Sequence, residues 1–198
     1  MRLLELFSGT KSVSKAVGHL YDEVVSVDIL NKNNPTHCVD ILQWDYKQYP
    51  VGYFDAIWAS PPCTEYSFIL HSRPDRPRNL VLANNIVKRT LEIIEYFNPD
   101  KWFIENPQTG LLKEQDIMLG IPYYDIDYCR YSEWGYRKRT RIWTCKDNFK
   151  PLLCNKKCGN MIGKTHKYST GNSKMGLKIK SQKELYRIPE LLIKDLFV

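Results

Sequence analysis

A cysteine in a stiff loop is the residue of this chain best suited to covalent chemistry. Cys63 closes the tetrapeptide Ser60-Pro61-Pro62-Cys63, which follows an apolar run at residues 53–58. Each proline fixes its own φ and restricts the residue before it, so the pair aims the side chain that follows. A thiol presented in this way at the end of a buried strand indicates a nucleophile. The alternative is a small apolar core residue, which is what most free cysteines are.

Small and acidic residues follow other predicted strands. The turn Phe7-Ser8-Gly9-Thr10 leads into a predicted helix, and a glycine-containing turn at a helix N-terminus suits a nucleotide-like or carboxylate-bearing ligand. Asp28 follows about 20 residues later, a spacing that suits an acid on ribose hydroxyls. Asp40 is suited to the exocyclic amine of a purine. An ordinary strand-to-helix turn and a turn cap also explain these residues.

Charged residues in the second half of the chain add one acid and two cations. Glu105 ends the apolar run Phe103-Ile104, and burial there would raise its pKa and let it donate a proton. Arg139 and Arg141 alternate on one face of an extended segment, which suits bracing a phosphate or a carbonyl. The alternatives are a solvated carboxylate at a strand end and a basic surface strand.

Four residues near the C-terminus are of the types that ligate zinc. They are Cys145, Cys154, Cys158 and His166, and together they could close a tetrahedral site. Such a site would order a lysine-rich segment that has too few apolar residues to fold by itself. Reduced surface thiols and an exposed histidine are the alternative.

These residues need a scaffold in which strands and helices alternate. The pattern predicts strands at residues 1–7, 23–29, 38–41, 54–59, 102–105, 124–128 and 141–144, and helices at 13–20, 79–97 and 184–197. Alternation of this kind indicates a mostly parallel sheet with helices on both faces. Ligands of such sheets bind outside the carboxyl ends of the strands, where the acids and Cys63 are expected.

Length and charge limit the class of protein. A chain of 198 residues can form one domain with a hydrophobic core. Its 29 Lys and Arg against 22 Asp and Glu favour a polyanionic partner, with a basic protein that binds no nucleic acid as the alternative. We expect no secretory signal and no membrane contact, because no apolar run approaches the roughly 20 residues that span a bilayer. The predicted compartment is intracellular and reducing, so the cysteines are expected to be free.

The order of these motifs resembles that of one enzyme family. A strand followed by Phe-Ser-Gly, then Asp28, Asp40, Pro-Pro-Cys63, Glu105-Asn106-Pro107 and Arg139-Thr140-Arg141, is similar to the cytosine carbon-5 DNA methyltransferases. The resemblance covers residues 1–144, and faintly the last fifteen, and is to compact members encoded by phages and large DNA viruses. It implies a Rossmann-like methyltransferase fold, S-adenosylmethionine as cofactor and DNA as substrate. For a viral protein it also implies the host cytoplasm or nucleus.

The resemblance also implies roles for single residues. Cys63 matches the nucleophile that adds to carbon 6 of a flipped cytosine, and Glu105 matches the acid at ring nitrogen 3 and the exocyclic amine. Arg139 and Arg141 match the pair that supports the flipped base and the loop. Asp28 matches the acid on the cofactor ribose and Asp40 the acid on its adenine. The full set expected at the cofactor is Phe7, Ser8, Gly9, Thr10, Asp28, Ile29, Asp40, Ile41, Ser60 and Pro61.

Some positions depart from the family pattern. Lys11 stands where the family has the second glycine of the cofactor loop, and no large target-recognition domain fits after Thr144. The chain is expected to comprise a catalytic domain at 1–144, a small lysine-rich segment at 145–183 and a C-terminal helix at 184–198 that packs back on the catalytic domain. A partner protein for target recognition is a further expectation.

Two other functions remain open from the sequence. Ser-Pro-Pro with Tyr66 nearby is also a signature of the exocyclic amino methyltransferases, which modify N4 of cytosine or N6 of adenine and need no thiol. A non-catalytic nucleic-acid-binding module on a degenerate methyltransferase fold is the other. RNA is also open as a substrate, as is the choice between single-stranded and double-stranded DNA.

Overall fold

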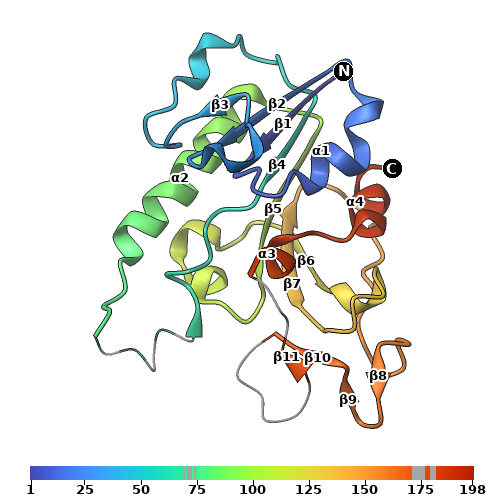
Figure 1. Ribbon diagram of the computed structural model, residues 1–198. Coiled ribbons are helices and arrows are strands. Elements are labelled where there is room, and N and C mark those ends of the chain that lie inside the picture. Colours follow the sequence, from blue (N-terminus) through green and yellow to red (C-terminus); the bar gives the residue numbers. More distant parts are fainter. Residues whose placement is uncertain (69, 71–72, 74, 171–176, 179–181) are drawn as a thin grey trace.

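The computed structural model describes residues 1–68, 70, 73, 75–170, 177–178 and 182–198, and a seven-stranded sheet forms its centre (Figure 1). The strand order is β3-β2-β1-β4-β5-β7-β6. Neighbours are parallel except where β7 pairs with β5 and β6. The strands are β1 (Arg2–Leu6), β2 (Glu23–Asp28), β3 (His37–Cys38), β4 (Ala56–Ala59), β5 (Lys101–Pro107), β6 (Tyr123–Asp127) and β7 (Arg139–Thr144). The predicted mostly parallel sheet is confirmed.

Helices cover both faces of this sheet. On one face α2 (Leu80–Phe97) packs its buried Val87 into a cluster with Leu4 of β1. On the other face α1 (Ser12–Val17) and α4 (Glu190–Phe197) share a cluster with Leu3. Leu3 and Leu4 are adjacent in β1 and therefore point to opposite faces. A strand buried on both faces reads as a continuous apolar run, as β1 does.

Local signals set the bounds of the longest helix. The Asn79 side chain accepts a hydrogen bond from the backbone N–H of Leu82 at 3.0 Å and caps the start of α2. Asn98 ends the helix with a left-handed φ of 46°. The sequence prediction of a helix at 79–97 therefore agrees with the structure to within one residue.

The C-terminal helix expected at 184–197 is two helices. Pro189 separates α3 (Gln182–Tyr186) from α4, because proline lacks an N–H and keeps the preceding residue out of the helical region. The second helix lies against α1, and Lys101 Nζ donates to the carbonyl of Phe197 at 2.6 Å. The end of the chain is thereby fixed to the sheet.

Smaller differences affect the rest of the chain. The third strand is His37–Cys38 rather than 38–41, so Asp40 lies in the turn after it. The segment after β7 contains the short strands β8 (Met161–Ile162), β9 (Thr165–His166), β10 (Tyr168–Ser169) and β11 (Leu177–Lys178). Residues 171–176 and 179–181 of the expected lysine-rich segment lie outside the described residues. In the described part of the chain, no helix is both long and apolar enough to cross a bilayer.

Candidate active site and metal centre

A cavity of about 600 Å³ opens at the carboxyl ends of β1, β2, β4 and β5. All ten residues expected at the cofactor line it, and so do Cys63 and Glu105. They meet there because parallel strands present their carboxyl ends at one edge of the sheet. The structure therefore gathers residues that are up to about a hundred positions apart in the sequence.

The turn after β1 is held by the acid that follows β2. Asp28 accepts the N–H of Gly9 at 2.7 Å and the N–H of Leu30 at 2.8 Å, one on each carboxylate oxygen. Each oxygen keeps further acceptor capacity, which leaves it available to hydroxyl groups of a ligand. Asp40 follows β3, the next strand along the chain, and its side chain accepts the N–H of Leu42 at 3.0 Å.

Lys11 adopts a backbone conformation that favours glycine. Its φ of 55° lies in the left-handed region, which costs a residue with a side chain roughly 1–2 kcal/mol. The ammonium group donates to the carbonyl of Asn34 at 2.7 Å. Lys11 is not among the described residues that line the cavity.

Glu5 in the middle of the sheet supports this turn and was missed from the sequence. It is 2% exposed and accepts the N–H groups of Val13 and Ser14, each at 3.1 Å, and also the Ser14 hydroxyl. Burial raises the pKa of Glu5, while these hydrogen bonds oppose the rise. A charged residue inside the otherwise apolar run Leu3–Leu6 is the signal that could have found it.

The loop that carries Cys63 is fixed from β5. Asn106 donates from Nδ2 to the carbonyl of Pro61 at 2.9 Å, and Tyr66 donates its N–H to the carbonyl of Cys63 at 3.1 Å. The Cys63 thiol is half-buried. Burial raises the pKa of this thiol, the nearby Lys138 lowers it and Glu105 raises it again, with a net rise. A ligand or base that changes these charges would change the amount of thiolate.

Glu105 lies at the centre of a buried polar group. It is 6% exposed and accepts the Tyr128 hydroxyl at 3.0 Å and the Lys138 ammonium at 3.3 Å. Lys138 also donates to the carbonyl of Leu185 at 3.2 Å and lies 4.9 Å from the centre of the Tyr128 ring. The half-exposed Tyr186 of α3 lines the same cavity. Lys138, Tyr128 and Tyr186 are site residues that sequence reasoning missed.

Arg139 and Arg141, which were expected to support the flipped base and the loop, are not among the described residues that line the cavity. Both share one face of β7, but Arg139 binds Asp127 at 3.2 Å and Arg141 binds Asp125 at 2.7 Å. Their β-bridge partners across the antiparallel pair are the same two acids of β6. Lys138, the residue before β7, does line the cavity, because antiparallel β7 begins where parallel β5 ends. The direction of β7 could not be read from its residues.

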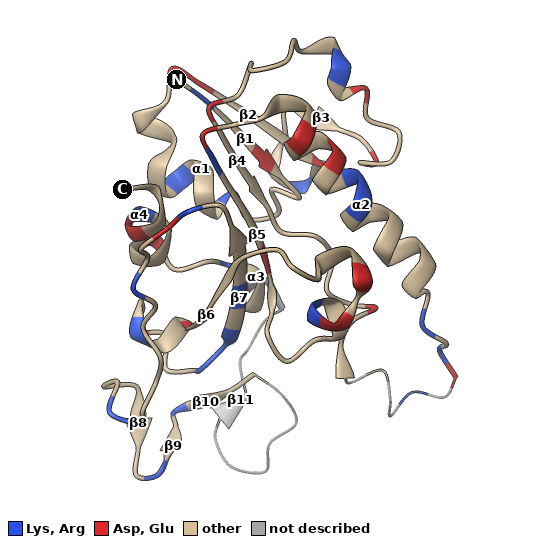
Figure 2. Ribbon diagram, turned by 180° about the vertical axis from the view of Figure 1, so that it is seen from behind, with Lys and Arg blue, Asp and Glu red and all other residues tan. Residues whose placement is uncertain are grey.

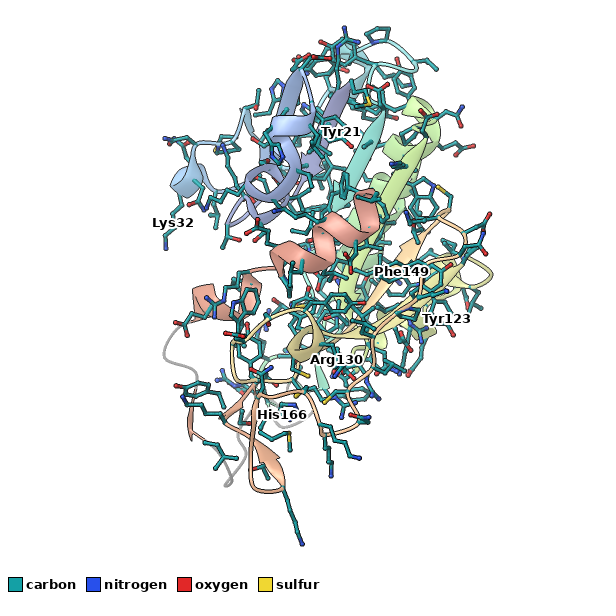
Figure 3. All side chains as sticks on the ribbon, turned by 90° about the vertical axis from the view of Figure 1, so that its right-hand side faces the viewer. Tyr21, Lys32, Tyr123, Arg130, Phe149 and His166 are labelled. Carbon is teal, nitrogen blue, oxygen red and sulfur yellow. The ribbon has the colours of Figure 1, made fainter. Side chains whose placement is uncertain are left out.

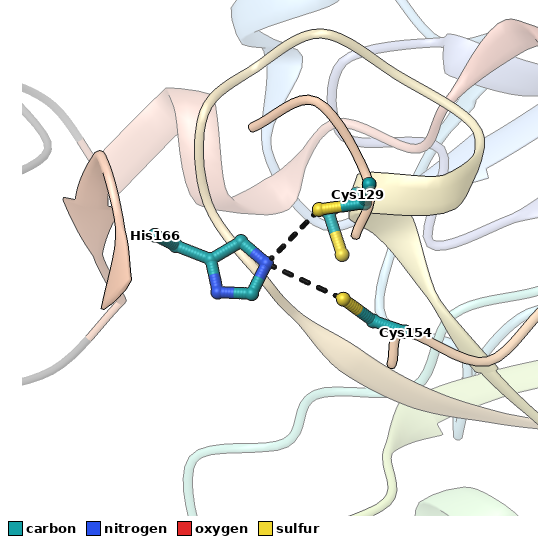
Figure 4. A group of neighbouring side chains, drawn as sticks. Cys129, Cys154 and His166 are labelled. Carbon is teal, nitrogen blue, oxygen red and sulfur yellow. Dashed lines mark hydrogen bonds between the residues drawn. The ribbon is translucent and has the colours of Figure 1, made fainter. Parts of the chain in front are cut away.

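A second group of thiols lies at the same edge of the sheet, beyond β6. The ligating atoms of Cys129, Cys154, Cys158 and His166 are all within 4.8 Å of one another. Figure 4 shows the His166 ring pointing toward the sulfur atoms. His166 Nε2 is 3.5 Å from the sulfur of Cys154 and 3.3 Å from that of Cys158. In Figure 3 His166 lies at the opposite end of the molecule from Tyr21, which precedes β2.

The expected metal ligand Cys145 is not part of this cluster. Cys145 follows β7 and its sulfur lies 3.9 Å from the carbonyl of Asp100, beside the start of β5. The six residues of β7 span about 20 Å, so this is the wrong edge of the sheet. Cys129 follows β6, which runs parallel to β5, and its thiol lies at the correct edge. All six cysteines are free thiols, in agreement with the sequence prediction.

The cavity fits S-adenosylmethionine in size and chemistry. Its volume is in the range of about 300–1,000 Å³ that small-molecule sites occupy. The apolar side chains of Phe7, Ile29 and Ile41 line it together with the carboxylates of Asp28 and Asp40. Carboxylates that accept hydrogen bonds from hydroxyl and amine groups, beside apolar side chains, suit a nucleoside. The turn at Gly9 leaves backbone groups available to the rest of the cofactor.

Comparison with known proteins identifies the family. The family model of the C-5 cytosine-specific DNA methylases matches residues 1–148. A protein of Frog virus 3 (isolate Goorha), named "Probable DNA (cytosine-5)-methyltransferase", is 38% identical over 99% of this chain and 98% of its own length. This relative confirms the expected kinship with viral enzymes.

Solved structures share the fold. A prophage-encoded protein of E. coli, assigned as a DNA modification methyltransferase, has a TM-score of 0.53 and 14% identity over 73% of this chain and 46% of that one. The Entamoeba histolytica methyltransferase EhMeth has a TM-score of 0.52 and 18% identity over 78% of this chain and 55% of that one. The chain spans about half the length of these two proteins.

Fold, motif order and relatives agree, and the methyltransferase family and fold imply S-adenosylmethionine as the methyl donor. The chain therefore belongs to the C-5 cytosine-specific DNA methylase family.

Proposed function

We propose that this chain methylates carbon 5 of cytosine in DNA through a covalent bond between Cys63 and the base. One observation carries the proposal: the Cys63 thiol, the Glu105 carboxyl and Lys138 share a cavity with two acids suited to the methyl donor. The family and the viral relative support DNA cytosine as the substrate.

Cys63 is proposed to start the reaction, because carbon 5 of cytosine is a weak nucleophile. Its thiolate forms a bond to carbon 6, and protonation at ring nitrogen 3 takes up the displaced electron pair. Carbon 5 is then the electron-rich end of an enamine. The target base has to leave the helical stack first, since an intact duplex covers both carbons.

Glu105 is proposed to hold nitrogen 3 and the exocyclic amine of the base. Tyr128 and Lys138 both donate to one of its oxygens, Oε1, which fixes the carboxyl and leaves Oε2 for the base. Lys138 also favours the thiolate form of Cys63, because a nearby positive charge lowers the pKa of a thiol. Arg139 and Arg141 are positioning residues in this account, since they fix β7 to β6 through Asp127 and Asp125.

Bound S-adenosylmethionine supplies an electrophilic methyl group to carbon 5. The chain holds that cofactor with Asp28 at the ribose, Asp40 at the adenine and the Phe7–Thr10 turn along the rest. Zinc, the second group expected from the sequence, would be held by the cluster of Cys129, Cys154, Cys158 and His166, and none of these is among the described residues that line the cavity. In the last step a base removes the carbon-5 proton, and the electron pair of that bond forms the carbon 5–carbon 6 double bond as the carbon–sulfur bond breaks and returns the Cys63 thiolate. Nitrogen 3 gives its proton back to the Glu105 carboxylate, which leaves neutral 5-methylcytosine.

The wider setting follows from the substrate. Lys and Arg occur along β7 and around β8 and β9, where Figure 2 shows them in blue, and such residues suit a phosphate backbone. DNA substrate and free cysteines are consistent with a reducing intracellular compartment. Target choice through a partner protein, and the division at residues 144 and 183, remain proposals.

The other two functions are less well supported. An exocyclic amino methyltransferase needs no thiol, and the family assignment does not favour it. A non-catalytic module is also not favoured, because the cavity keeps every expected cofactor residue.

The identity of the methylated base tests the proposal. Duplex DNA is incubated with the chain and S-adenosylmethionine carrying a labelled methyl group, and its nucleosides are separated. We expect label in 5-methylcytosine, and none when every cytosine in the DNA is already methylated at carbon 5. Label in N4-methylcytosine or N6-methyladenine would support the amino methyltransferase instead, and label only in an RNA substrate would change the substrate.

A further inference from the structure

We propose that Cys129, Cys154, Cys158 and His166 bind one zinc ion, which fixes the segment at residues 150–169 against the end of β6. The site is separate from the methyl-transfer cavity, and none of its four residues is among the described residues that line that cavity. The inference goes beyond the proposed methylation and does not depend on it.

The spacing of the ligand atoms fits a tetrahedral ion. Zinc bonds of about 2.3 Å to sulfur and about 2.0–2.1 Å to nitrogen give tetrahedral edges of about 3.6 Å between sulfur and nitrogen. His166 Nε2 lies 3.5 and 3.3 Å from two of the sulfurs. All four ligating atoms lie within 4.8 Å of one another, so small side-chain shifts close the tetrahedron. Three thiolates and one imidazole are a donor set typical of structural zinc.

The surrounding backbone is built to hold thiolates. Lys156 donates its N–H to the sulfur of Cys154 at 3.3 Å, and the left-handed φ of 65° at Lys156 belongs to this tight turn. Cys154 donates its own N–H to the buried carboxylate of Asp127 at 2.8 Å. Hydrogen bonds of this second layer orient metal ligands.

A buried asparagine fixes the segment independently. Asn160 donates from Nδ2 to the carbonyls of Cys129 and Ser132, both at 2.9 Å, and accepts the N–H of Gly135 at 2.8 Å. The segment therefore lies on the loop after β6 at a defined place. Its own sequence has few apolar residues, so metal ligation supplies folding energy that a core would otherwise provide.

The segment that the ion would hold is strongly basic. Residues 150–169 contain the exposed lysines 150, 156, 157, 164 and 167 and no Asp or Glu. Asp127, which binds Cys154, also holds Arg137 at 2.8 Å and Arg139 at 3.2 Å. Lys138 lies between these two arginines in the sequence and reaches Glu105. The ion would thus order a cationic surface next to the active site.

Metal content tests the proposal on the full chain. The purified protein, analysed by elemental mass spectrometry after dialysis with zinc, should hold about one ion per chain. The variant Cys154→Ser should bind zinc at least about tenfold more weakly. Cys145→Ser, the matched control at the other edge of the sheet, should hold the wild-type amount. Equal loss in both variants, or no zinc in the wild type, would overturn the site.

Two measurements keep the test valid if a variant folds poorly. Cobalt(II) bound to the wild-type chain should give the intense visible bands of a tetrahedral ion and a sulfur charge-transfer band, and a spectrum without them contradicts the ligand set. Chelation of the wild-type protein should open the lysine bonds of residues 150–169 to trypsin while the rest of the chain stays resistant. Unchanged cleavage would contradict the ordering role. None of these readouts depends on methyl transfer.

Discussion

The cavity around Cys63 and the cluster around Cys154 lie at the same edge of one sheet, but their thiols have different neighbours. Cys63 lies in a loop with two prolines, near one ammonium and one carboxyl group, and the described residues that line its cavity include no other cysteine or methionine. Cys154 has two other thiols and an imidazole within 4.8 Å. A single thiol beside a cation suits nucleophilic attack, whereas a group of thiols suits a metal. Neighbouring groups, rather than exposure or residue type, distinguish the two uses.

Removal of the Cys63 thiol should have the largest effect on the cavity and none on the cluster around Cys154. Cys63→Ala should lower the rate of methyl transfer by roughly 10⁴-fold or more, because no other group can form the bond to carbon 6. Its zinc content should equal that of the wild type, and S-adenosylmethionine should still bind, as measured by calorimetry. A Cys63→Ala variant whose rate of methyl transfer stays within a few-fold of the wild-type rate would contradict the assignment of Cys63 as the nucleophile.

The charges around Cys63 should act with opposite signs. Lys138→Met removes a positive charge that stabilises the thiolate, so the pKa of Cys63 should rise and alkylation of this thiol should require a higher pH. Glu105→Gln removes a negative charge, and the pKa should fall. The pH profile of alkylation, followed by mass spectrometry of the Cys63 peptide, measures both.

A control lysine makes this test specific. Lys88 is exposed on α2, and Lys88→Met should leave the alkylation profile of Cys63 unchanged. Shifts of the same sign in Lys138→Met and Glu105→Gln would mean that Cys63 responds to altered packing rather than to charge.

The smallest effect is expected at Lys11. Lys11→Gly relieves a left-handed conformation that costs roughly 1–2 kcal/mol. It also loses a hydrogen bond to Asn34 worth about 0.5–1 kcal/mol, and glycine loses about 0.5–1 kcal/mol more conformational entropy on folding. The free energy of unfolding should therefore change by less than about 0.5 kcal/mol in denaturant titrations. Affinity for S-adenosylmethionine should stay within about twofold, since the ammonium group points to Asn34. A large gain in affinity would place the Lys11 charge in the cavity after all.

The same comparison explains what the sequence could predict. In residues 1–107 each parallel strand ends at the same edge, so chain order alone brought Asp28, Asp40, Cys63 and Glu105 together. The second half contains β7, whose antiparallel direction depends on its neighbours and leaves no mark on its residues. Because β7 is antiparallel, Cys145 at its end lies at the far edge of the sheet, whereas Cys129 lies at the edge where the cluster forms. For the same reason Lys138, which precedes β7, lines the cavity.

Buried polar partners were hidden for a related reason. Tyr128 looks like an ordinary residue of an apolar segment, and only its hydrogen bond to the buried Glu105 shows its use. The charge of Glu5 inside an apolar run is a visible signal, but its partners at the start of α1 are not. The ion pairs of β7 with β6 could not be predicted either, because they depend on the register between the two strands, which no local pattern fixes. That register places Arg139 opposite Asp127 and Arg141 opposite Asp125.

Covalent trapping tests the central claim about Cys63 most directly. The chain is incubated with S-adenosylmethionine and duplex DNA in which cytosine is replaced by 5-fluorocytosine, because fluorine at carbon 5 cannot leave as a proton and blocks elimination. We predict a complex that survives denaturation, carries the transferred methyl group and maps to the peptide that contains Cys63. Cofactor binding without any such complex across several DNA sequences, or a complex at another cysteine, would contradict the account.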